Sequence, residues 1–288
     1  MNGPVAELTD RLQGVGYLAD RGLATAAHVA LTLGRPLLLE GEVGVGKTEI
    51  AKALATVLDR RLIRLQCYEG IDAHQALYEW DYARQLLQIR ALGAEELRGE
   101  ETVASLYSPD FLLERPLLAA VRAGHDAVLL IDEVDRADDE FEAFLLELLS
   151  DFQVTIPEIG TVAAGSPPLV VLTSNRTREL HDALKRRCLY HWVGYPDAGR
   201  ELEIVLTRAP EVAETLAATV VAAVGRLRSL DLAKPPGVAE TIDWAQTIDV
   251  IGGDDLDAEV AGDTLGAVVK DRDDLDLVLP QLARIVGG

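Results

Sequence analysis

The sequence predicts an α/β protein, in which a parallel sheet is followed by a smaller helical domain. Three observations lead to this prediction. A glycine-rich segment, Gly41–Thr48, stands between a short apolar run and an amphipathic helical pattern. Two further apolar runs, 127–131 and 169–172, each end in polar residues, as buried parallel strands do at a ligand-binding edge. From residue 196 onward the chain is mainly helical in pattern.

The glycine-rich segment fits the pattern G-x-x-x-x-G-K-[ST] of a phosphate-binding loop. Residues 36–40 suit a buried strand, and residues 48–58 place their apolar side chains on one helical face, so a chance glycine turn is disfavoured. Glycines let backbone N–H groups surround a phosphate, and the helix N-terminus adds partial positive charge. Lys47 can reach the β- and γ-phosphates, and the Thr48 hydroxyl can ligate Mg²⁺. The predicted nucleotide-binding residues are Gly41, Glu42, Val43, Gly44, Val45, Gly46, Lys47, Thr48 and Glu49.

The next segments predict a second strand and then a helical insertion. Residues 61–67 alternate as a strand does, and residues 72–123 contain no obvious strand. We expect helices over 73–91 and 111–121, with Pro116 starting or kinking the second, and an exposed charged stretch over 95–101. Three aromatic residues of this region can face a pore or a partner, or can equally pack in the core: Tyr78, Trp80 and Tyr82.

The run 127–131 continues into Asp132 and Glu133, which is the Walker B pattern. A buried strand here carries Asp132 to the sheet edge, where its carboxylate can hold Mg²⁺. Glu133 can polarise the attacking water as a general base. Two adjacent acids are common in surface turns, so the assignment depends on the phosphate-binding loop that precedes it. A helix over 138–152 and a hairpin over 154–162 are predicted to follow.

The strand predicted over 169–173 ends in Ser174 and Asn175. From its position on a neighbouring strand tip, Asn175 can hold the lytic water; a simple Asx turn is the alternative. A helix beginning near Thr177 leads to a basic triplet, 185–187. Either a solvated basic face or an arginine finger supplied to a neighbouring subunit explains Arg186 and Arg187.

Composition excludes several classes of protein. The 288 residues carry a formal net charge of −21, which argues against binding to nucleic acid or to anionic membranes. No apolar run reaches about 18 residues, so we expect no membrane insertion. Cys67 and Cys188 have no metal-site spacing and fit a reduced, cytoplasmic setting. The aspartate-rich tail interleaves apolar residues, which predicts short folded helices instead of a disordered acidic segment.

Together these motifs resemble those of AAA+ ATPases, which have an αβα P-loop core with a parallel sheet and a small helical lid. Within that superfamily, segments 38–41 and 64–66 and the length of chain between Lys47 and Asp132 resemble the MoxR group. Segments 66–70, 187–192 and 234–241 are similar to CoxD-like members of that group, which are linked to maturation of the molybdenum–copper site of carbon monoxide dehydrogenase.

The resemblance implies roles and boundaries. Asp132 and Glu133 would form Walker B, Asn175 would be sensor 1, and Arg187 or Arg186 would be the finger. A nucleotide-binding core would span 1–195, with an insertion around 72–110, and a lid would span 196–288. Relatives commonly carry a sensor 2 arginine early in a lid helix, but residues 237–242 contain Thr241 and no arginine. The lid would therefore either not sense the γ-phosphate or sense it through Arg226 or Arg228. ATP, Mg²⁺, a hexameric ring and a partner with a von Willebrand factor A domain are also implied.

Two functions remain open from the sequence. The first is an ATP-hydrolysing chaperone that remodels a client metalloenzyme during its assembly or maturation. The second is a nucleotide-gated binding module with little intrinsic hydrolysis, which the missing lid arginine favours. A DNA-dependent motor is disfavoured by the charge, and a GTPase by the lack of an Asn-Lys-x-Asp motif. A small-molecule kinase would not need Asn175 followed by a helical lid.

Overall fold

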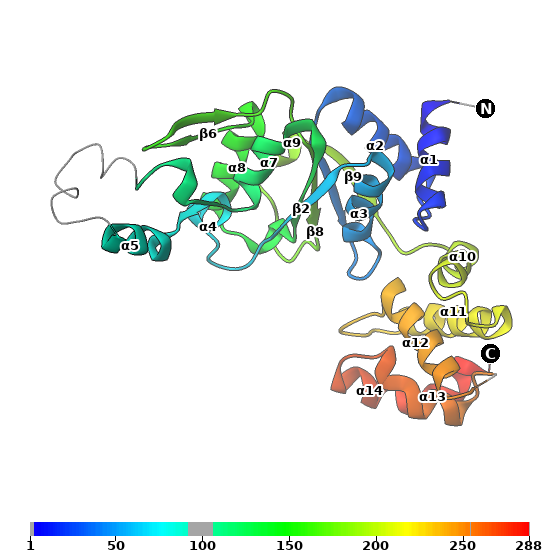
Figure 1. Ribbon diagram of the computed structural model, residues 1–288. Coiled ribbons are helices and arrows are strands. Elements are labelled where there is room, and N and C mark those ends of the chain that lie inside the picture. Colours follow the sequence, from blue (N-terminus) through cyan, green and yellow to red (C-terminus); the bar gives the residue numbers. More distant parts are fainter. Residues whose placement is uncertain (1–2, 92–105, 254, 288) are drawn as a thin grey trace. The chain divides into compact units, whose positions relative to one another are not determined.

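The computed structural model describes residues 3–91, 106–253 and 255–287, and the chain forms two compact units (Figure 1). The core unit comprises Met1–Arg11, Asp20–Glu40 and Ile50–His191. The helical unit comprises Leu12–Ala19, Gly41–Glu49 and Trp192–Gly288, so the phosphate-binding loop groups with the C-terminal helices. The charged stretch predicted over 95–101, and Asp254 of the acidic tail, lie outside the described residues. The division at residue 195 stays a prediction.

Among the described residues, five strands form the central sheet in the order β2-β5-β8-β1-β9. Parallel pairing joins β2 to β5, β5 to β8 and β8 to β1, with Leu37 opposite Val171 and Val128 opposite Leu169. Because β1, β5 and β8 are buried along their whole length, they read as continuous apolar runs. The strands are β1 (Leu37–Gly41), β2 (Arg61–Gln66), β5 (Ala127–Asp132), β8 (Leu169–Ser174) and β9 (Leu189–Val193).

Helices pack around this sheet and share one hydrophobic core with it, which includes Leu38, Leu129 and Leu172. The helix α7 lies against β2 and β5, and it begins at Pro116, so this proline starts a helix and does not kink one. The helices of the N-terminal part and of the core are α1 (Pro4–Gly14), α2 (Arg21–Leu33), α3 (Lys47–Leu58), α7 (Pro116–Ala123), η3 (Gly124–Asp126), η4 (Val134–Arg136), α8 (Asp139–Asp151) and α9 (Asp182–Arg187).

The insertion differs from its prediction, because the single helix expected over 73–91 is interrupted by a strand. That strand pairs antiparallel with a second short strand, Tyr78 opposite Glu114, although no strand was expected in 72–123. Trp80 is buried and packs edge-on against Tyr107, whereas Tyr82 is exposed. The elements are α4 (Ala73–Leu77), β3 (Tyr78–Trp80), α5 (Tyr82–Ala91), η2 (Pro109–Phe111) and β4 (Leu112–Glu114). The hairpin predicted over 154–162 is confirmed as β6 (Gln153–Ile156) and β7 (Gly160–Ala163).

The C-terminal helices have a core of their own, centred on Trp244, which is fully buried and donates from Nε1 to Thr264 Oγ1 at 2.8 Å. The aspartates take part in this fold: Asp257 and Asp271 are N-caps, and buried Asp274 accepts two backbone N–H bonds. The predicted short helices are thereby confirmed. They are α10 (Ala198–Arg208), α11 (Glu214–Arg228), α12 (Val238–Val250), α13 (Ala258–Thr264), η5 (Leu265–Ala267), α14 (Arg272–Val278), η6 (Leu279–Gln281) and α15 (Leu282–Val286).

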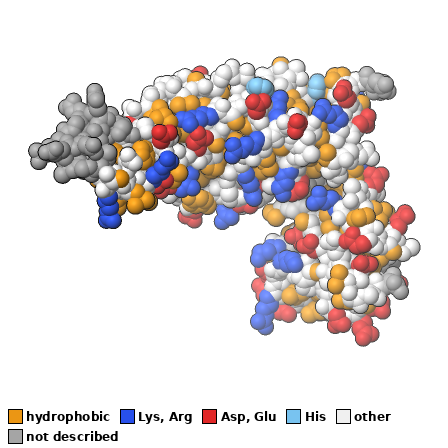
Figure 2. All heavy atoms as spheres, in the orientation of Figure 1, with side chains coloured by type: hydrophobic (Ala, Val, Ile, Leu, Met, Phe, Trp, Pro, Cys, Tyr) orange, Lys and Arg blue, Asp and Glu red, His pale blue; other side chains and the backbone are white. Residues whose placement is uncertain are grey.

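Acidic side chains are spread over the visible face of the C-terminal helices (Figure 2). Within the described ranges, none of the helices combines the length and the apolar character that crossing a bilayer requires.

Candidate active site

The phosphate-binding loop follows β1 directly, and α3 begins at Lys47, as the motif predicts. Gly44 and Gly46 have φ values of 75° and 90°, a left-handed conformation that glycine adopts without strain. The Lys47 side chain is buried, and its ammonium donates to the carbonyl oxygens of Gly41, at 2.8 Å, and of Glu42. The Lys47 ammonium therefore lies against the backbone of the glycine-rich loop. Thr48 is half-buried on the first turn of the helix.

The loop also contacts the first turn of α12, within the helical unit. Gly44 O accepts from the N–H groups of Val238, at 3.0 Å, and of Ala239, at 3.3 Å. A Cβ atom on Gly237 would lie 2.7 Å from Val43 O and from the Gly44 Cα atom, so only glycine permits this approach. The loop is thus tied to the helical unit by backbone contacts that involve no arginine.

The Walker B aspartate, Asp132, is buried at the end of β5 and is held from both neighbouring strands. Arg64 on β2 donates from Nε at 3.0 Å and from Nη2 at 2.6 Å to Oδ2. The Thr173 hydroxyl on β8 donates to Oδ1 at 2.5 Å and accepts from Glu133 N at 2.9 Å. These bonds fix both carboxylate oxygens. The sequence predicts no role for Thr173, and Arg64 enters there only as part of the segment that resembles the MoxR group. Their contacts with Asp132 become visible only when the order of the strands is known.

Glu133 directly follows β5 in a left-handed backbone conformation, with φ 54° and ψ 50°. For a residue with a side chain this conformation is uncommon and costs about 1–2 kcal/mol, and such residues cluster at functional sites. The Glu133 carboxylate pairs with Arg136 Nη1 at 3.1 Å, one turn further along the chain. Glu133 is one of the residues that line an open cleft of the core unit.

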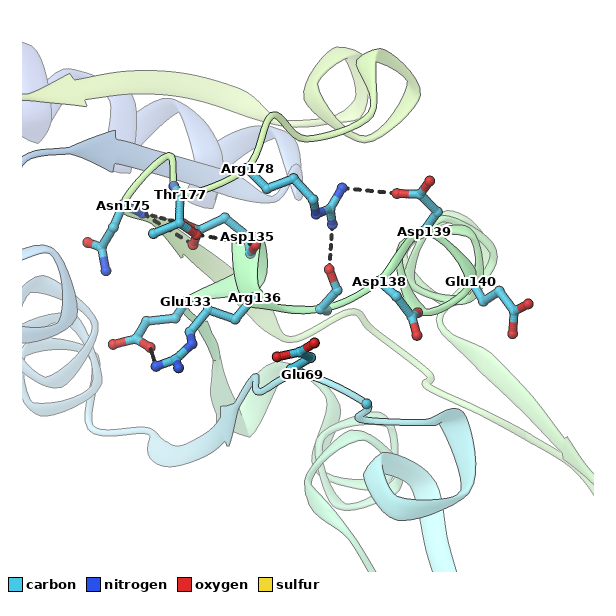
Figure 3. Close-up of a pocket in the computed structure, with 12 residues that line it drawn as sticks. Glu69, Glu133, Asp135, Arg136, Asp138, Asp139, Glu140, Asn175, Thr177 and Arg178 are labelled. Carbon is cyan, nitrogen blue, oxygen red and sulfur yellow. Dashed lines mark hydrogen bonds and ion pairs between the residues drawn. The ribbon is translucent and has the colours of Figure 1, made fainter.

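That cleft has a volume of about 960 Å³ and brings Glu133 and Asn175 together on one surface (Figure 3). Asn175 begins the segment after β8, so the two residues come from the ends of strands that are neighbours in the sheet. The remaining lining residues are Glu69, Gly70, Asp135, Arg136, Ala137, Asp138, Asp139, Glu140, Thr177 and Arg178. Six carboxylates against two guanidinium groups make the cleft acidic.

The segment after Asn175 stays non-helical further than predicted: α9 begins at Asp182, not near Thr177. Two buried carboxylates of the core explain the delay. Asp135 accepts from the N–H of Thr177 at 2.8 Å, and Glu142 accepts from the N–H of His181 at 2.8 Å. These side chains take up donors that a helix would have placed in its first turn, so the helix starts only beyond them.

The basic triplet ends α9, and Arg186 and Arg187 are exposed. Arg35 holds the backbone of this end, donating to Arg186 O at 2.9 Å and to Arg187 O at 3.2 and 3.1 Å. Among the described residues, neither side chain of the pair has an ion-pair partner.

The C-terminal arginines considered for lid sensing are engaged elsewhere. Arg228 forms a two-bond ion pair with buried Glu201, Nη1 to Oε2 at 2.6 Å and Nη2 to Oε1 at 2.8 Å. Arg226 donates from Nε to Ile285 O at 2.5 Å. The Arg228 guanidinium also lies 3.4 Å from the hydroxyl of Thr241, the residue that stands where an arginine was expected.

Both cysteines are buried free thiols. Burial raises the pKa of Cys67 to about 12, and the nearby carboxylates of Asp132, Asp135 and Glu133 contribute to this rise. Burial likewise raises the pKa of Cys188 to about 12. In the described part of the chain, no group of three or more His, Cys, Asp or Glu residues is arranged to hold a metal ion. Both thiols are thus buried within the core of the protein.

Comparison with known proteins agrees with this geometry. The profile of the AAA domain (dynein-related subfamily) matches residues 36–188, which is more than half of the chain. An uncharacterised protein of Staphylococcus haemolyticus is 26% identical over 186 residues, covering 62% of this chain and 63% of that protein. One of Staphylococcus saprophyticus is 26% identical over 185 residues, covering 62% of each. The chain thus spans less than two thirds of these curated relatives.

Among solved structures, a point mutant of RuvB from Thermotoga maritima matches with a TM-score of 0.50 and 18% identity, over 85% of this chain and 67% of that one. A likeness at this level of identity shows the fold alone, and it agrees with a P-loop core of the AAA+ type followed by helices. From the profile match, the chain belongs to the AAA domain family, in its dynein-related subfamily.

Proposed function

We propose that the chain is an ATPase that hydrolyses ATP to ADP and phosphate with Mg²⁺. The observation that carries this proposal is the meeting of Glu133 and Asn175 on one cleft, at the sheet edge where the strand of the phosphate-binding loop also ends. The left-handed glycines form a cradle for phosphate, and the Thr48 hydroxyl and Asp132 carboxylate are the oxygen ligands that Mg²⁺ prefers. Bound Mg²⁺ would neutralise charge on the phosphates.

In this proposal the loop amides and the Lys47 ammonium bind the phosphates. Glu133 takes a proton from the attacking water, and the Asn175 amide orients that water. Arg187, or Arg186, reaches the γ-phosphate of a neighbouring subunit, because both guanidinium groups are exposed at the end of α9. This role requires a homo-oligomer, and the resemblance to MoxR proteins favours a hexameric ring.

We propose further that the ATPase acts as a chaperone in the assembly or maturation of a client metalloenzyme. The similarity of three segments to CoxD-like proteins supports the molybdenum–copper site of carbon monoxide dehydrogenase as the client, with a von Willebrand factor A domain protein as partner. The net charge of −21 is unsuited to nucleic acid, and the buried, protonated thiols suit a reducing cytoplasm.

A nucleotide-gated binding module is the second candidate. Two contacts favour it: Arg136 occupies the Glu133 carboxylate, and Arg228 is engaged by Glu201. A chain in this arrangement would bind ATP and hydrolyse it slowly until a partner rearranges the site.

The deciding measurement is the ATPase rate per subunit as a function of protein concentration, with the Glu133→Gln variant as a control. We expect the rate to climb with concentration, because each site needs an arginine from a neighbour, and the variant to bind ATP but turn over at least ~10²-fold more slowly. Equal turnover by the variant would remove Glu133 from the role of base. A flat rate near zero, with ATP bound, would favour the gated module.

A further inference from the structure

Asp135 is a buried carboxylate for which the proposed mechanism has no use. It lies in η4, two residues after Glu133, and only 2% of its surface is exposed. Its carboxylate accepts from the N–H of Asn175 at 3.2 Å and from the N–H and the hydroxyl of Thr177 at 2.8 and 2.7 Å. These partners all lie in the segment that begins with the proposed water-orienting residue (Figure 3).

These bonds connect the ends of two strands at the point where the chemistry is proposed. The turn after β5 contains Glu133, and the segment after β8 contains Asn175; Asp135 belongs to the first and binds the second. The segment 175–181 forms no helix of its own, so bonds from neighbouring side chains hold it in place: Asp135 binds its beginning, at Asn175 and Thr177, and Glu142 binds its end, at His181. Arg176, between the two bound residues, has a φ of 57°, an uncommon conformation that the flanking bonds maintain.

The residue type matters for this arrangement. An ionised carboxylate is an acceptor only and can satisfy several converging donors, and hydrogen bonds to charged groups are roughly twice as strong as neutral ones. An asparagine of the same shape retains one acceptor oxygen and presents N–H donors toward the N–H groups of the segment. It cannot replace the aspartate without displacing at least one partner.

We propose that Asp135 is a positioning residue that fixes Asn175 relative to Glu133, so that the distance between the water-orienting amide and the general base stays constant. The proposal rests on the ATPase function proposed above, which it extends by one residue. Asp135 itself acts through the backbone of segment 175–181 and takes no proton from water.

The first test needs no nucleotide: amide hydrogen exchange of the full chain, resolved at Asn175 and Thr177. In Asp135→Asn we expect both amides to exchange about tenfold faster or more, the scale of a lost hydrogen bond to a charged acceptor. Glu142→Gln is the matched control, because Glu142 is also a buried carboxylate that binds the same segment, at the N–H of His181. The control should speed exchange at His181 and leave Asn175 unchanged. Unchanged exchange at Asn175 in Asp135→Asn would overturn the proposal.

The second test is a double-mutant cycle in ATPase rate between Asp135→Asn and Asn175→Ala. We expect Asp135→Asn to lower kcat about tenfold or more with KM nearly unchanged, and the double variant to be no slower than Asn175→Ala alone. If the kcat losses of the two single variants multiply in the double variant, Asp135 acts through some other group. If Asp135→Asn folds poorly, Thr177→Val removes only the hydroxyl donor and should show a smaller kcat loss of the same kind. A wild-type chain without ATPase activity would overturn the proposed function, and the exchange experiment would still decide the role of Asp135.

Discussion

The buried ion pair of the helical unit leads to the sharpest stability prediction, for the substitution Arg228→Met. The Arg228 side chain is 12% exposed and that of Glu201 is 2% exposed, so both charges are removed from water. Beyond its two bonds to Glu201, the guanidinium donates to Pro236 O at 2.7 Å and lies 4.3 Å from the ring centre of Tyr195. Methionine fills similar space but leaves the Glu201 carboxylate with one remaining donor, the Thr241 hydroxyl at 2.6 Å.

Removing one partner of a buried pair typically costs about 3–5 kcal/mol, because the other charge stays buried without compensation. That is a large part of the about 5–15 kcal/mol that stabilises most domains. Replacing both partners, as in Glu201→Leu with Arg228→Met, should cost much less than the sum of the single changes, since no charge is then left in the interior.

Urea unfolding followed by Trp244 fluorescence measures this loss, in a background where Trp80 and Trp192 are replaced by phenylalanine. Trp244 is fully buried in the same unit as the ion pair, so its emission reports unfolding there. A cost below about 1 kcal/mol for Arg228→Met, or a double variant as unstable as the sum of both single variants, would refute the assignment of a desolvated pair.

Three further predictions concern the thiols and the contact between α12 and the phosphate-binding loop. With pKa values raised from 9.0 to about 12, Cys67 and Cys188 should resist a disulfide reagent at pH 8 until denaturant is added. Because the folded state keeps both thiols protonated, their contribution to the free energy of unfolding should be complete below pH 9 and should decline as the pH rises from 9 toward 12. The expected slope is about 1.4 kcal/mol per pH unit per thiol, and unfolding free energies measured across that range will test it. Gly237→Ala places a Cβ atom 2.7 Å from the loop backbone, so it should lower the free energy of unfolding by about 1–3 kcal/mol. The control Gly225→Ala lies in open space on α11 and should raise the free energy of unfolding by about 0.5–1 kcal/mol. Equal effects of the two substitutions would contradict the close contact at Gly237.

The parts of the fold that were predictable from the sequence are those set by local pattern. The loop between β1 and α3 needs glycines at fixed offsets, and the buried strands are continuous apolar runs, so both could be located. The strand pair β3 and β4 could not be predicted, because each strand has three residues, which is too few to show an alternating pattern. The two strands are also far apart in the sequence, so their pairing is not visible locally. The start of α9 was misplaced because tertiary bonds from Asp135 and Glu142 override local helical preference.

The same distinction applies to the candidate site. The positions of Asp132, Glu133 and Asn175 at the sheet edge could be predicted, because each follows an apolar run. The residues that hold them were missed: Arg64 and Thr173 reach Asp132 only because β5 lies between β2 and β8, an order that sequence proximity does not reveal. The position of Asp135, two residues after Glu133, is only a weak signal of its role, because an aspartate in a surface turn gives the same sequence pattern.

The strand order also determines when this protein can fold during synthesis. The strand β1 is made early, but its partner β8 is made much later, since Leu37 pairs with Val171. The strands β2 and β5 also cannot join β1 in one sheet until β8 has been made, because β8 lies between β5 and β1. At about 5–20 residues per second, the ribosome leaves the phosphate-binding loop without its supporting sheet for several seconds. A nascent chain that ends before residue 169 should therefore neither bind ATP nor resist protease, and apolar strand segments remain exposed to chaperones throughout that interval.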